Sequence, residues 1–332
     1  MPNPTPASVH VNGLLTEMSV GWMQDDASFV ADRVFGRVGV QKQSDIIPEY
    51  DRGDLYRIMI DRRAAGAIPT RIGYRTKKTQ TYFAEEWAAD HVIDDQLRAN
   101  ADAPFSPEVD GTRFLTQQLK LRREQQWIVS FFSTGNLWTG SSDGADLVAG
   151  TDFTAWSNAA SNPLDDVAKY RSGVKRETGY YPNKLVLHDQ VWNDLKNHPD
   201  IVERITGNGG PDNPAVVNRR SVAALMELED VQVASAVQNS GGEGSTAADS
   251  FGFIAGKHAL LVYADPNPTL WSPTGGVTYT WDALVSGAAA GQAILTFREP
   301  NEIGDIVRIR AAWDQKIVAS DVGVFLANAS TK

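Results

Sequence analysis

A short, strongly basic segment in an otherwise acidic chain most constrains what this sequence can fold into. Positions 57–78 hold seven basic residues and one acid, Asp61, which gives the segment a net charge of +6. Since the chain of 332 residues carries -10 in total, the rest of it carries -16. The basic residues are Arg57, Arg62, Arg63, Arg71, Arg75, Lys77 and Lys78.

The same segment has the composition of two β-strands. Residues 55–60 and 71–76 are rich in β-branched and aromatic residues, and Ile72 and Tyr74 alternate with arginines. The intervening Ala-Ala-Gly-Ala-Ile-Pro supplies a turn, so the sequence predicts a long hairpin with few apolar residues to bury. Because a lone hairpin is marginal in water, we expect it to lie on an acidic surface, such as that of a neighbouring copy. A solvated hairpin and a phosphate-binding patch are the alternatives.

Helix and strand patterns divide the rest of the chain. A long helix is predicted over residues 106–132, where Ser-Pro-Glu is a good helix start and apolar residues then recur at helical spacing. The next pieces describe a compact α/β unit: a helix from residue 163, a turn into a buried strand over 181–187, a helix capped by Asp189, a helix at 220–228 and a strand with Val231, Val233 and Val237. Alternating apolar residues predict long antiparallel strands near the C-terminus. They lie at residues 277–283 and 307–314, and a last short strand lies at 322–326.

Composition and motifs exclude several classes of function. Cysteine is absent, which excludes disulfides, thiolate metal sites and cysteine nucleophiles. A pI of about 5.0 argues against a whole molecule built to bind nucleic acid. No apolar run approaches the roughly 18 residues of a membrane helix, so no membrane partner is expected. The start, Met-Pro-Asn-Pro-Thr-Pro, predicts an extended arm rather than a secretory signal.

The candidate chemical groups do not form a catalytic constellation. His91 with Asp94 and Asp95 would suit a metal ion if they shared a helix face, but a helix start or a charged surface is the favoured interpretation. Glu85 and Glu86 are adjacent on a predicted strand, and adjacent strand residues point to opposite faces. We therefore predict no enzyme activity, no metal site and no cofactor.

The order of these pieces resembles the major capsid proteins of tailed bacteriophages, the Hong Kong ninety-seven fold. Residues 181–205, YPNKLVLHDQVWNDLKNHPDIVERI, are similar to the family's strand-then-helix in its axial domain. Residues 251–263, FGFIAGKHALLVY, resemble its later core strand, and residues 307–326, VRIRAAWDQKIVASDVGVFL, resemble its closing strands. The resemblance covers nearly the whole chain, and the order of the motifs is more specific than any one of them.

The resemblance implies an α+β fold with six parts. These are an N-terminal arm over residues 1–43, an extended loop formed by a β-hairpin over 44–81, a peripheral domain over 82–143 with a spine helix at 106–132, an axial domain over 144–266, peripheral return strands over 267–318, and a final strand over 319–332 that returns to the axial domain.

The resemblance also implies a function and a role for the basic segment. The chain is expected to be a structural protein that self-assembles, as pentamers and hexamers, into an icosahedral shell around the double-stranded DNA genome of a tailed phage. In this family the extended loop lies over the neighbouring subunit's peripheral domain, so the seven basic residues are expected to face carboxylates of an adjacent copy. The candidate carboxylates are Glu85, Glu86, Asp90, Asp94 and Asp95.

Further partners follow from the same resemblance. A separate scaffolding protein and a portal are expected, because the arm follows Met1 without a long charged helical segment. A decoration protein is an open possibility, and an acidic interior implies weak, non-specific contact with packaged DNA. Lys77 and Lys78 lie in the loop that forms isopeptide crosslinks in some relatives, but no crosslink is expected here. The location would be the virion capsid, assembled in the cytoplasm of the bacterial host.

Two other functions stay open at this point. An encapsulin-like bacterial nanocompartment shares the fold, but its usual N-terminal cargo-binding helix is incompatible with the proline-rich start of this chain. A soluble hydrolase that works with two carboxylates would need a deep cleft that holds carboxylates of perturbed pKa.

Overall fold

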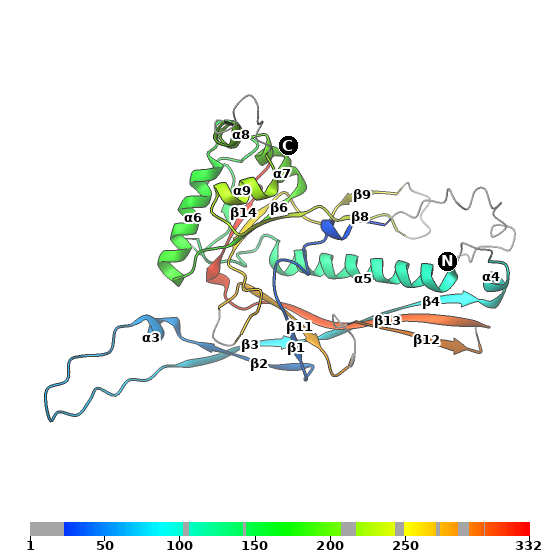
Figure 1. The fold of residues 1–332 in the computed structure, drawn as a ribbon, viewed down its shortest axis with the longest axis horizontal. Helices are drawn as coiled ribbons and strands as arrows, with labels where there is room; N and C mark the ends of the chain where they lie inside the picture. The colour runs from blue at the N-terminus through cyan, green and yellow to red at the C-terminus, as the bar shows by residue number, and fades with distance from the viewer. Residues whose placement is uncertain are drawn as a thin grey trace.

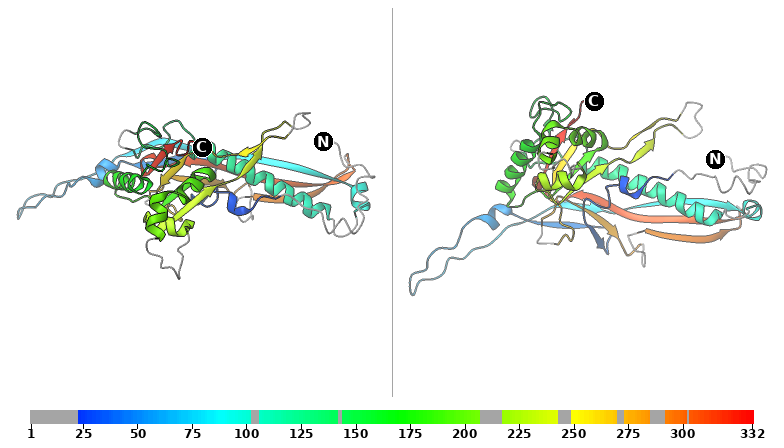
Figure 2. Two further views of the ribbon diagram at one scale, coloured as in Figure 1. Left: turned by 90° about the horizontal axis from the view of Figure 1, so that it is seen from above. Right: turned by 45° about the horizontal axis from the view of Figure 1, so that its top comes forward.

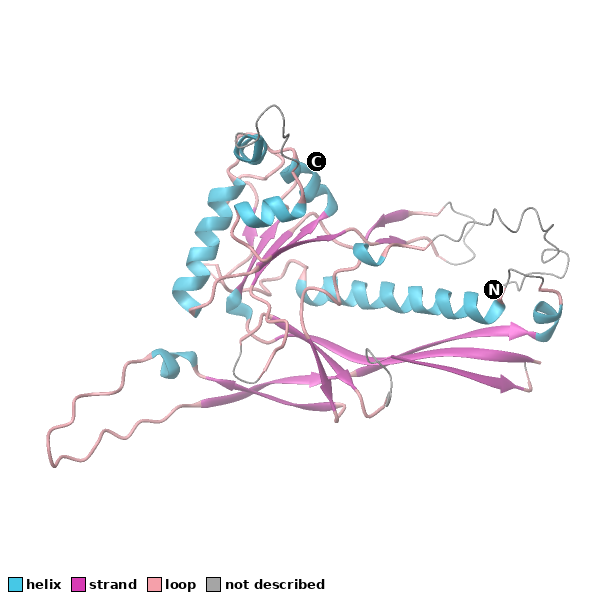
Figure 3. Cartoon of the chain, viewed as in Figure 1, coloured by secondary structure: helices cyan, strands magenta, loops and turns pink. Residues whose placement is uncertain are grey.

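The computed structural model describes residues 23–101, 106–141, 144–206, 217–242, 249–269, 273–284, 292–301 and 303–332. Residues 1–22 of the predicted arm lie outside the described residues. Over the described part, a long sheet with a long helix on one face adjoins a compact sheet wrapped by shorter helices (Figures 1 and 3). A narrow loop projects from one end of the molecule, away from both sheets (Figures 1 and 2).

The long sheet is built around β13 (Gly304–Ile317). One edge of β13 pairs antiparallel with β4 (Glu85–Asp94), and its other edge pairs with β12 (Gln292–Glu299) and then with β11 (Gly276–Trp281). β1 (Arg37–Val40) adds in parallel to β11. The two strands predicted from alternation are therefore confirmed as β11 and β13, whereas β12 was not predicted.

Helix α5 (Pro107–Phe131) packs along the long sheet and confirms the helix predicted over residues 106–132. Ser106 stands at the N-cap, but its side chain makes no capping hydrogen bond, so proline and the first-turn acids mark the start. Alternate residues of β13 pack in the cluster with the helix, since successive side chains of a strand point to opposite faces. The cluster beneath α5 contains Ile93, Leu115, Leu119, Val307, Ile309, Ala311 and Trp313.

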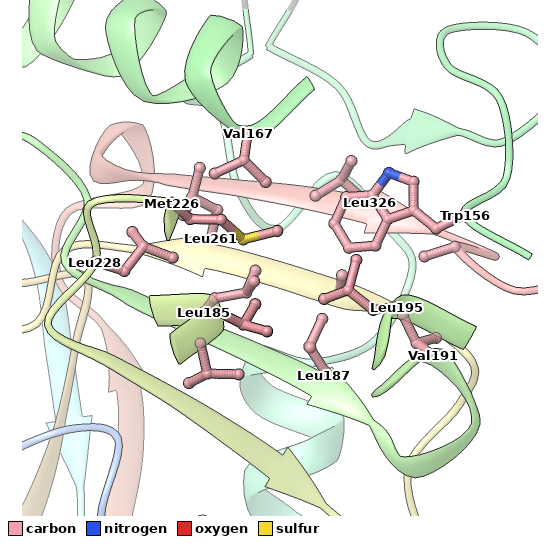
Figure 4. Close-up of a cluster of buried hydrophobic side chains, with 14 of the residues drawn as sticks. Trp156, Val167, Leu185, Leu187, Val191, Leu195, Met226, Leu228, Leu261 and Leu326 are labelled. Atoms are coloured by element: carbon pink, nitrogen blue, oxygen red, sulfur yellow. The ribbon is translucent and has the colours of Figure 1, made fainter. Parts of the chain in front are cut away.

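The compact sheet has the strand order β5-β14-β10-β6-β7. Figure 4 shows its core, where Leu185, Leu187 and Leu261 of the sheet meet Val167 and Leu195 of the helices. The strands are β5 (Leu147–Val148), β6 (Lys184–His188), β7 (Asp230–Ala234), β10 (Ala259–Val262) and β14 (Gly323–Ala327). The helices around it are α6 (Pro163–Thr178), α7 (Asp189–Lys196), α8 (Pro199–Thr206) and α9 (Arg219–Leu225).

The predicted α/β unit and last strand are confirmed by these elements, with two differences. The N-cap of α7 is His188, whose Nδ1 accepts the Gln190 N–H at 3.0 Å, so the prediction that Asp189 is the cap is wrong. Asp189 is instead the first helical residue, where its charge suits the helix dipole. Helix α8 was not predicted. Small elements complete the unit: β8 (Val237–Asn239), β9 (Phe251–Phe253) and the 3-10 turn η3 (Ser320–Val322).

A shared aromatic core joins the two sheets. Phe35 contacts Phe131 of α5 with ring centroids 4.7 Å apart, and Trp138 donates its indole N–H to the Phe131 carbonyl at 2.7 Å. Val30 and Val34 are fully buried in the same cluster. The C-terminal part of the predicted arm thus belongs to the core, and it begins with the 3-10 turn η1 (Asp26–Ser28).

The projecting loop starts as a ribbon of β2 (Ser44–Tyr50) and β3 (Thr76–Phe83), with α3 (Arg52–Tyr56) after β2. The strands predicted at residues 55–60 and 71–76 are therefore wrong, apart from the first residue of β3. Strands form at the base, where the long sheet braces them, and not at the tip, where nothing covers them. The predicted turn is present, and the Ala67 N–H donates to the Ala64 carbonyl at 3.1 Å.

Two small features complete the description. Helix α4 (Asp95–Ala99) follows β4 at the far end of the long sheet. Among the described residues, no helix combines the length and the apolar content needed to cross a bilayer.

Candidate functional site

The base of the extended loop is fixed to the long sheet. The Phe83 N–H donates to Asp314 Oδ2 at 2.8 Å, and the Gln80 amide donates to the Val318 carbonyl at 3.3 Å. The ring of Tyr82 stacks on Tyr279 of β11, with centroids 4.7 Å apart. The ribbon therefore leaves the body in a defined direction.

A buried carboxylate links the two arms of the extended loop just before its tip. Asp54 of α3 accepts three hydrogen bonds from Arg75, from Nε at 2.7 Å, from Nη2 at 3.0 Å and from the backbone N–H at 3.2 Å. Asp51 adds an ion pair to the same guanidinium at 3.1 Å. These Arg75 hydrogen bonds hold the pKa of Asp54 below its ordinary value. Arg75 thus completes the loop's own structure.

Helix α3 also ties the loop to the compact sheet's helices. The Tyr56 hydroxyl donates to the Thr178 carbonyl at the end of α6, at 2.7 Å. Gly179, which ends α6 at φ 81°, leaves room for this contact, because a Cβ there would lie 2.9 Å from the Tyr56 hydroxyl. Arg52 pairs with Asp321 of η3. The angle of the loop is therefore set from two sides.

The predicted basic residues separate into two groups. Arg75 is engaged as above, and Arg57 lies 3.9 Å from Asp54. The other five make no ion pair with any residue in the described part of the chain. They are Arg62, Arg63, Arg71, Lys77 and Lys78, and all are exposed.

The predicted acidic partners lie on or next to β4, and three of them are already neutralised by their own chain. Asp90 accepts hydrogen bonds from Arg308, from Nε at 2.7 Å and from Nη2 at 2.6 Å, and these hydrogen bonds lower the pKa of Asp90. Glu86 accepts a hydrogen bond from Arg310 Nε at 2.6 Å. These contacts follow from the pairing of β4 with β13.

The remaining acids differ from one another. Asp95 accepts hydrogen bonds from both terminal nitrogens of Arg298, at 2.6 and 2.5 Å, and these hydrogen bonds lower its pKa. Asp94 caps α4 by accepting the Gln96 N–H at 2.8 Å. Glu85 has no ion pair among the described residues. Arg298, Arg308 and Arg310 were not predicted as partners of these acids, although Arg308 and Arg310 lie on the polar face of the predicted strand.

The groups considered for catalysis serve structural roles. His91 lies on strand β4 and packs beside the Phe114 ring, so it does not share a helix face with Asp94 and Asp95, which begin α4. Burial raises the pKa of Glu124 to about 7, but this carboxylate is 1% exposed and accepts the N–H groups of Val30 and Ala31 at 3.0 and 2.9 Å. Within the described residues no three acidic or histidine side chains gather as a metal site would require.

A cleft of about 610 Å³ lies between the loop base, β11 and η3. Two of its acids are held by neighbours. Asp45 has a lowered pKa because it accepts the Ile46 N–H and a hydrogen bond from Lys42, and Asp321 pairs with Arg52. A carboxyl that acts as a general acid near neutral pH needs a raised pKa, so Asp45 does not match that role. The cleft lies between the strands β2 and β3 of the loop and the elements β11 and η3.

Comparisons with known proteins agree with this geometry. No protein-family profile matches the chain. The major capsid protein of Burkholderia phage BcepMu is 23% identical over 253 residues, which are 76% of each chain. A phage-related protein from Bordetella bronchiseptica RB50 has a TM-score of 0.67 at 19% identity, over 97% of this chain and 98% of that chain.

Two further solved structures share the fold at lower identity. The mature capsid of bacteriophage PhiM1 has a TM-score of 0.57 at 13% identity, over 98% of both chains. An encapsulin complex from Synechococcus elongatus PCC 7942 has a TM-score of 0.56 at 9% identity, over 96% of this chain and 95% of that chain. The Hong Kong ninety-seven fold, the α+β class and the resemblance to phage major capsid proteins are therefore confirmed.

Proposed function

We propose that this chain is a structural major capsid protein, which assembles with copies of itself into the icosahedral shell of a tailed bacteriophage. The similarity to a phage major capsid protein over three quarters of the chain is the observation that carries the proposal. The fold of the remaining quarter agrees, because the solved capsids match almost the whole length. The role is structural rather than enzymatic.

We propose for this chain the same division into parts that the resemblance implied. Residues 44–81 form the extended loop, α5 is the spine helix of the peripheral domain, and residues 144–266 with the returning β14 form the axial domain. The long sheet belongs to the peripheral domain, and residues 1–43 are the N-terminal arm. The fixed angle of the loop base supports this division, because the tip is held out where another subunit can receive it.

The charges of the loop guide its docking on the adjacent copy. The free basic residues are Arg62, Arg63, Arg71, Lys77 and Lys78. Of the proposed acidic partners, Glu85 and Asp94 have no ion pair in the described part, although Asp94 caps α4, while Glu86, Asp90 and Asp95 are shared with arginines of their own chain. Exposed pairs are worth about 0.2–1 kcal/mol each, so charge contributes orientation and rate of approach more than strength.

The wider assembly follows from this role. The shell would contain pentamers and hexamers, with a separate scaffolding protein and a portal as partners in the infected cell that the chain does not require in order to close into shells. Packaged double-stranded DNA would touch an acidic interior weakly and without sequence preference. Assembly would take place in the cytoplasm of the bacterial host, and the finished chain would reside in the virion capsid.

An encapsulin-like nanocompartment is the second candidate, because the Synechococcus elongatus encapsulin shares the fold with a TM-score close to that of the phage capsid. The same experiment separates the two. Electron microscopy of the purified chain, over a titration of protein concentration and ionic strength, is expected to show closed shells. Shells that enclose protein cargo would favour the nanocompartment. Dispersed particles under all conditions would overturn both.

A further inference from the structure

Two histidines stand opposite each other at one end of the compact sheet. The His188 N–H donates to the His258 carbonyl at 3.2 Å, which continues the antiparallel pairing of β6 with β10 by one position. Directly opposed residues of an antiparallel pair have their side chains on the same face of a sheet, so the two imidazoles are neighbours. They share the face of Val186 and Leu260, which packs on the aromatic core next to α5.

Each imidazole accepts a backbone hydrogen bond through Nδ1. His188 Nδ1 accepts the Gln190 N–H at 3.0 Å and so caps α7. His258 Nδ1 accepts the Asn328 N–H at 3.0 Å, where the chain turns after β14 with Asn328 in the left-handed region at φ 55°. A ring nitrogen accepts a hydrogen bond only while it carries no proton. The geometry therefore requires the neutral form of both rings, with the proton on Nε2.

The packing around the two rings restricts their rotation. His188 is 3% exposed, and the Phe253 ring of β9 stands edge-on to it with centroids 5.0 Å apart. His258 lies against the fully buried Phe325 of β14, with centroids 5.1 Å apart. On another side of this ring, a Cβ at Gly256 would lie 2.5 Å from His258 Nε2. A ring that gained a proton could not turn Nδ1 away from its backbone partner without displacing these neighbours.

Burial and most of the nearby charges favour the neutral rings. Burial lowers the pKa of His188 below its ordinary value of 6.5, Lys257 and His258 lower it further, and Asp189 opposes them. Burial also lowers the pKa of His258, and Asp146 opposes that effect. The folded chain therefore binds these two protons less tightly than the unfolded chain. The stability that the rings contribute is present above pH 6.5 and is lost as pH falls through the lowered values.

We propose that His188 and His258 form an acid-sensitive latch, which fastens the start of α7 and the turn after β14 while both rings are neutral and releases them when the rings gain protons. Protonation would turn each Nδ1 from an acceptor into a donor that faces a backbone N–H, so both hydrogen bonds would be lost. It would also place two like charges on opposed residues, beside Lys257. The latch lies within one folded chain, so it does not depend on the proposed shell function.

Hydrogen exchange in the wild-type chain is the first test. Peptides over residues 188–196 and 323–330 contain the two amide donors, Gln190 and Asn328, and their exchange is measured at about pH 7.5 and about pH 5.0 with correction for the intrinsic rate. We expect the protection of both segments to fall at least about tenfold at the lower pH. Peptides from α6, in the same unit, are the internal reference and should keep their protection. Equal protection of the two segments at both pH values would overturn the proposal.

Matched variants assign the response to the two rings. His188→Asn and His258→Asn each keep an acceptor that does not titrate, because asparagine Oδ1 is as many bonds from Cα as Nδ1, and asparagine is a good N-cap. Each single variant should lose the pH response in its own segment, and the double variant should lose it in both. His91→Asn, on β4 of the other sheet, is the control and should respond as the wild type does. A double variant that responds like the wild type would contradict the latch.

Nuclear magnetic resonance of the histidine rings gives a test that does not require any variant to fold. The chain contains five histidines, and their ring nitrogens are followed in the isotope-labelled wild type as pH is lowered. Two rings should show the shifts of the Nε2–H tautomer at neutral pH and should titrate below pH 6.5, over the range in which the two segments lose protection. If all five rings titrate at pH 6.5 or above, the proposal is overturned.

Discussion

The outer face of the long sheet and the tip of the extended loop handle charge in opposite ways. On the sheet, Arg308 holds Asp90 and Arg310 holds Glu86 across neighbouring strands. At the tip, Arg62 and Arg63 have no acidic partner among the described residues, and the isoleucines around them are exposed. These two acids of the sheet are paired within one chain, whereas the tip is completed by another copy in the assembly we propose.

The same contrast holds for apolar surface. Under α5, Trp313 is fully buried, donates its indole N–H to Gln126 at 2.8 Å, and lies beneath the Arg123 guanidinium. At the tip, Ile58 keeps 94% of its surface in water. A substitution in the first region should therefore act on folding, and a substitution in the second on assembly.

The largest expected effect is that of Trp313→Ala. Removal of a fully buried tryptophan leaves a cavity between α5 and the long sheet, and the free energy of unfolding should fall by about 3–5 kcal/mol. Urea unfolding of the dispersed chain, followed by tryptophan fluorescence and circular dichroism, measures the change. Ile58→Ala is the control and should stay within about 0.5 kcal/mol of the wild type. Equal losses for both variants would show that the tip is packed within the monomer.

The second prediction concerns the buried carboxyl group of Glu124 on α5. Glu124 accepts the Val30 and Ala31 N–H groups, and burial raises its pKa from an ordinary 4.5 to about 7, with Asp32 raising it and Arg33 lowering it. The folded chain therefore holds this proton more tightly than the unfolded chain. Stability from this group is fully present below about pH 4.5 and is lost as pH rises through about 7.

Comparison with Glu124→Gln isolates that proton from all others. Between pH 4.5 and 8 the wild type should lose up to about 3 kcal/mol of unfolding free energy relative to the glutamine variant. Urea unfolding of both dispersed chains at a series of pH values measures the difference. Parallel pH curves for the two chains would mean that Glu124 has an ordinary pKa.

The elements that could be predicted from the sequence are those with a local signal. Pro107 with the following acids marks the start of α5, and Asn162 with Pro163 marks that of α6, where the Asn162 side chain accepts the Asp165 N–H. Strict alternation marks β13. By contrast β12 follows a run rich in Gly and Ala, and its residues 294 and 295 are both apolar, so it has no clean alternation.

The candidate site was predicted only in part, and the reason is distance along the chain. The basic residues of the loop could be listed from composition, but Asp90 and Arg308 are separated by 218 positions. Their pairing depends on the register of β4 against β13, which tertiary packing sets. The β-branched pattern at residues 55–60 misplaced the strands, because local propensity does not show that the tip lacks a partner for its backbone.

A smaller effect is expected at the base of the extended loop, where α3 contacts the end of α6. Tyr56→Phe removes the hydrogen bond to the Thr178 carbonyl while keeping the ring, and should lower the free energy of unfolding by about 0.5–1.5 kcal/mol at most. Its main consequence should be a looser loop base, seen as faster hydrogen exchange in α3. Tyr74→Phe, a tyrosine further along the loop, is the control. Unchanged exchange in α3 would show that Arg52 alone fixes the angle.

The smallest expected effect comes from comparing Glu85, an acid without an ion pair in the described part of the chain, with Asp90, an acid that is already paired. Glu85 lacks an ion pair in the described part of the chain, whereas Asp90 accepts two hydrogen bonds from Arg308. If free cations of a neighbouring loop use the open acid, Glu85→Gln should raise the concentration for half-assembly at low salt, by less than about fivefold, since one exposed pair is lost.

Asp90→Asn is the matched variant, and it should leave that concentration unchanged, because the neighbour never had full use of the Asp90 carboxylate. Both variants should behave like the wild type at high salt, where exposed charges are screened. Sedimentation of the three chains side by side measures the difference. The reverse order, with Asp90→Asn the more damaging, would mean that the arginines of β13 exchange their acids for a neighbour's loop on assembly, and that the sheet face is not complete in one chain.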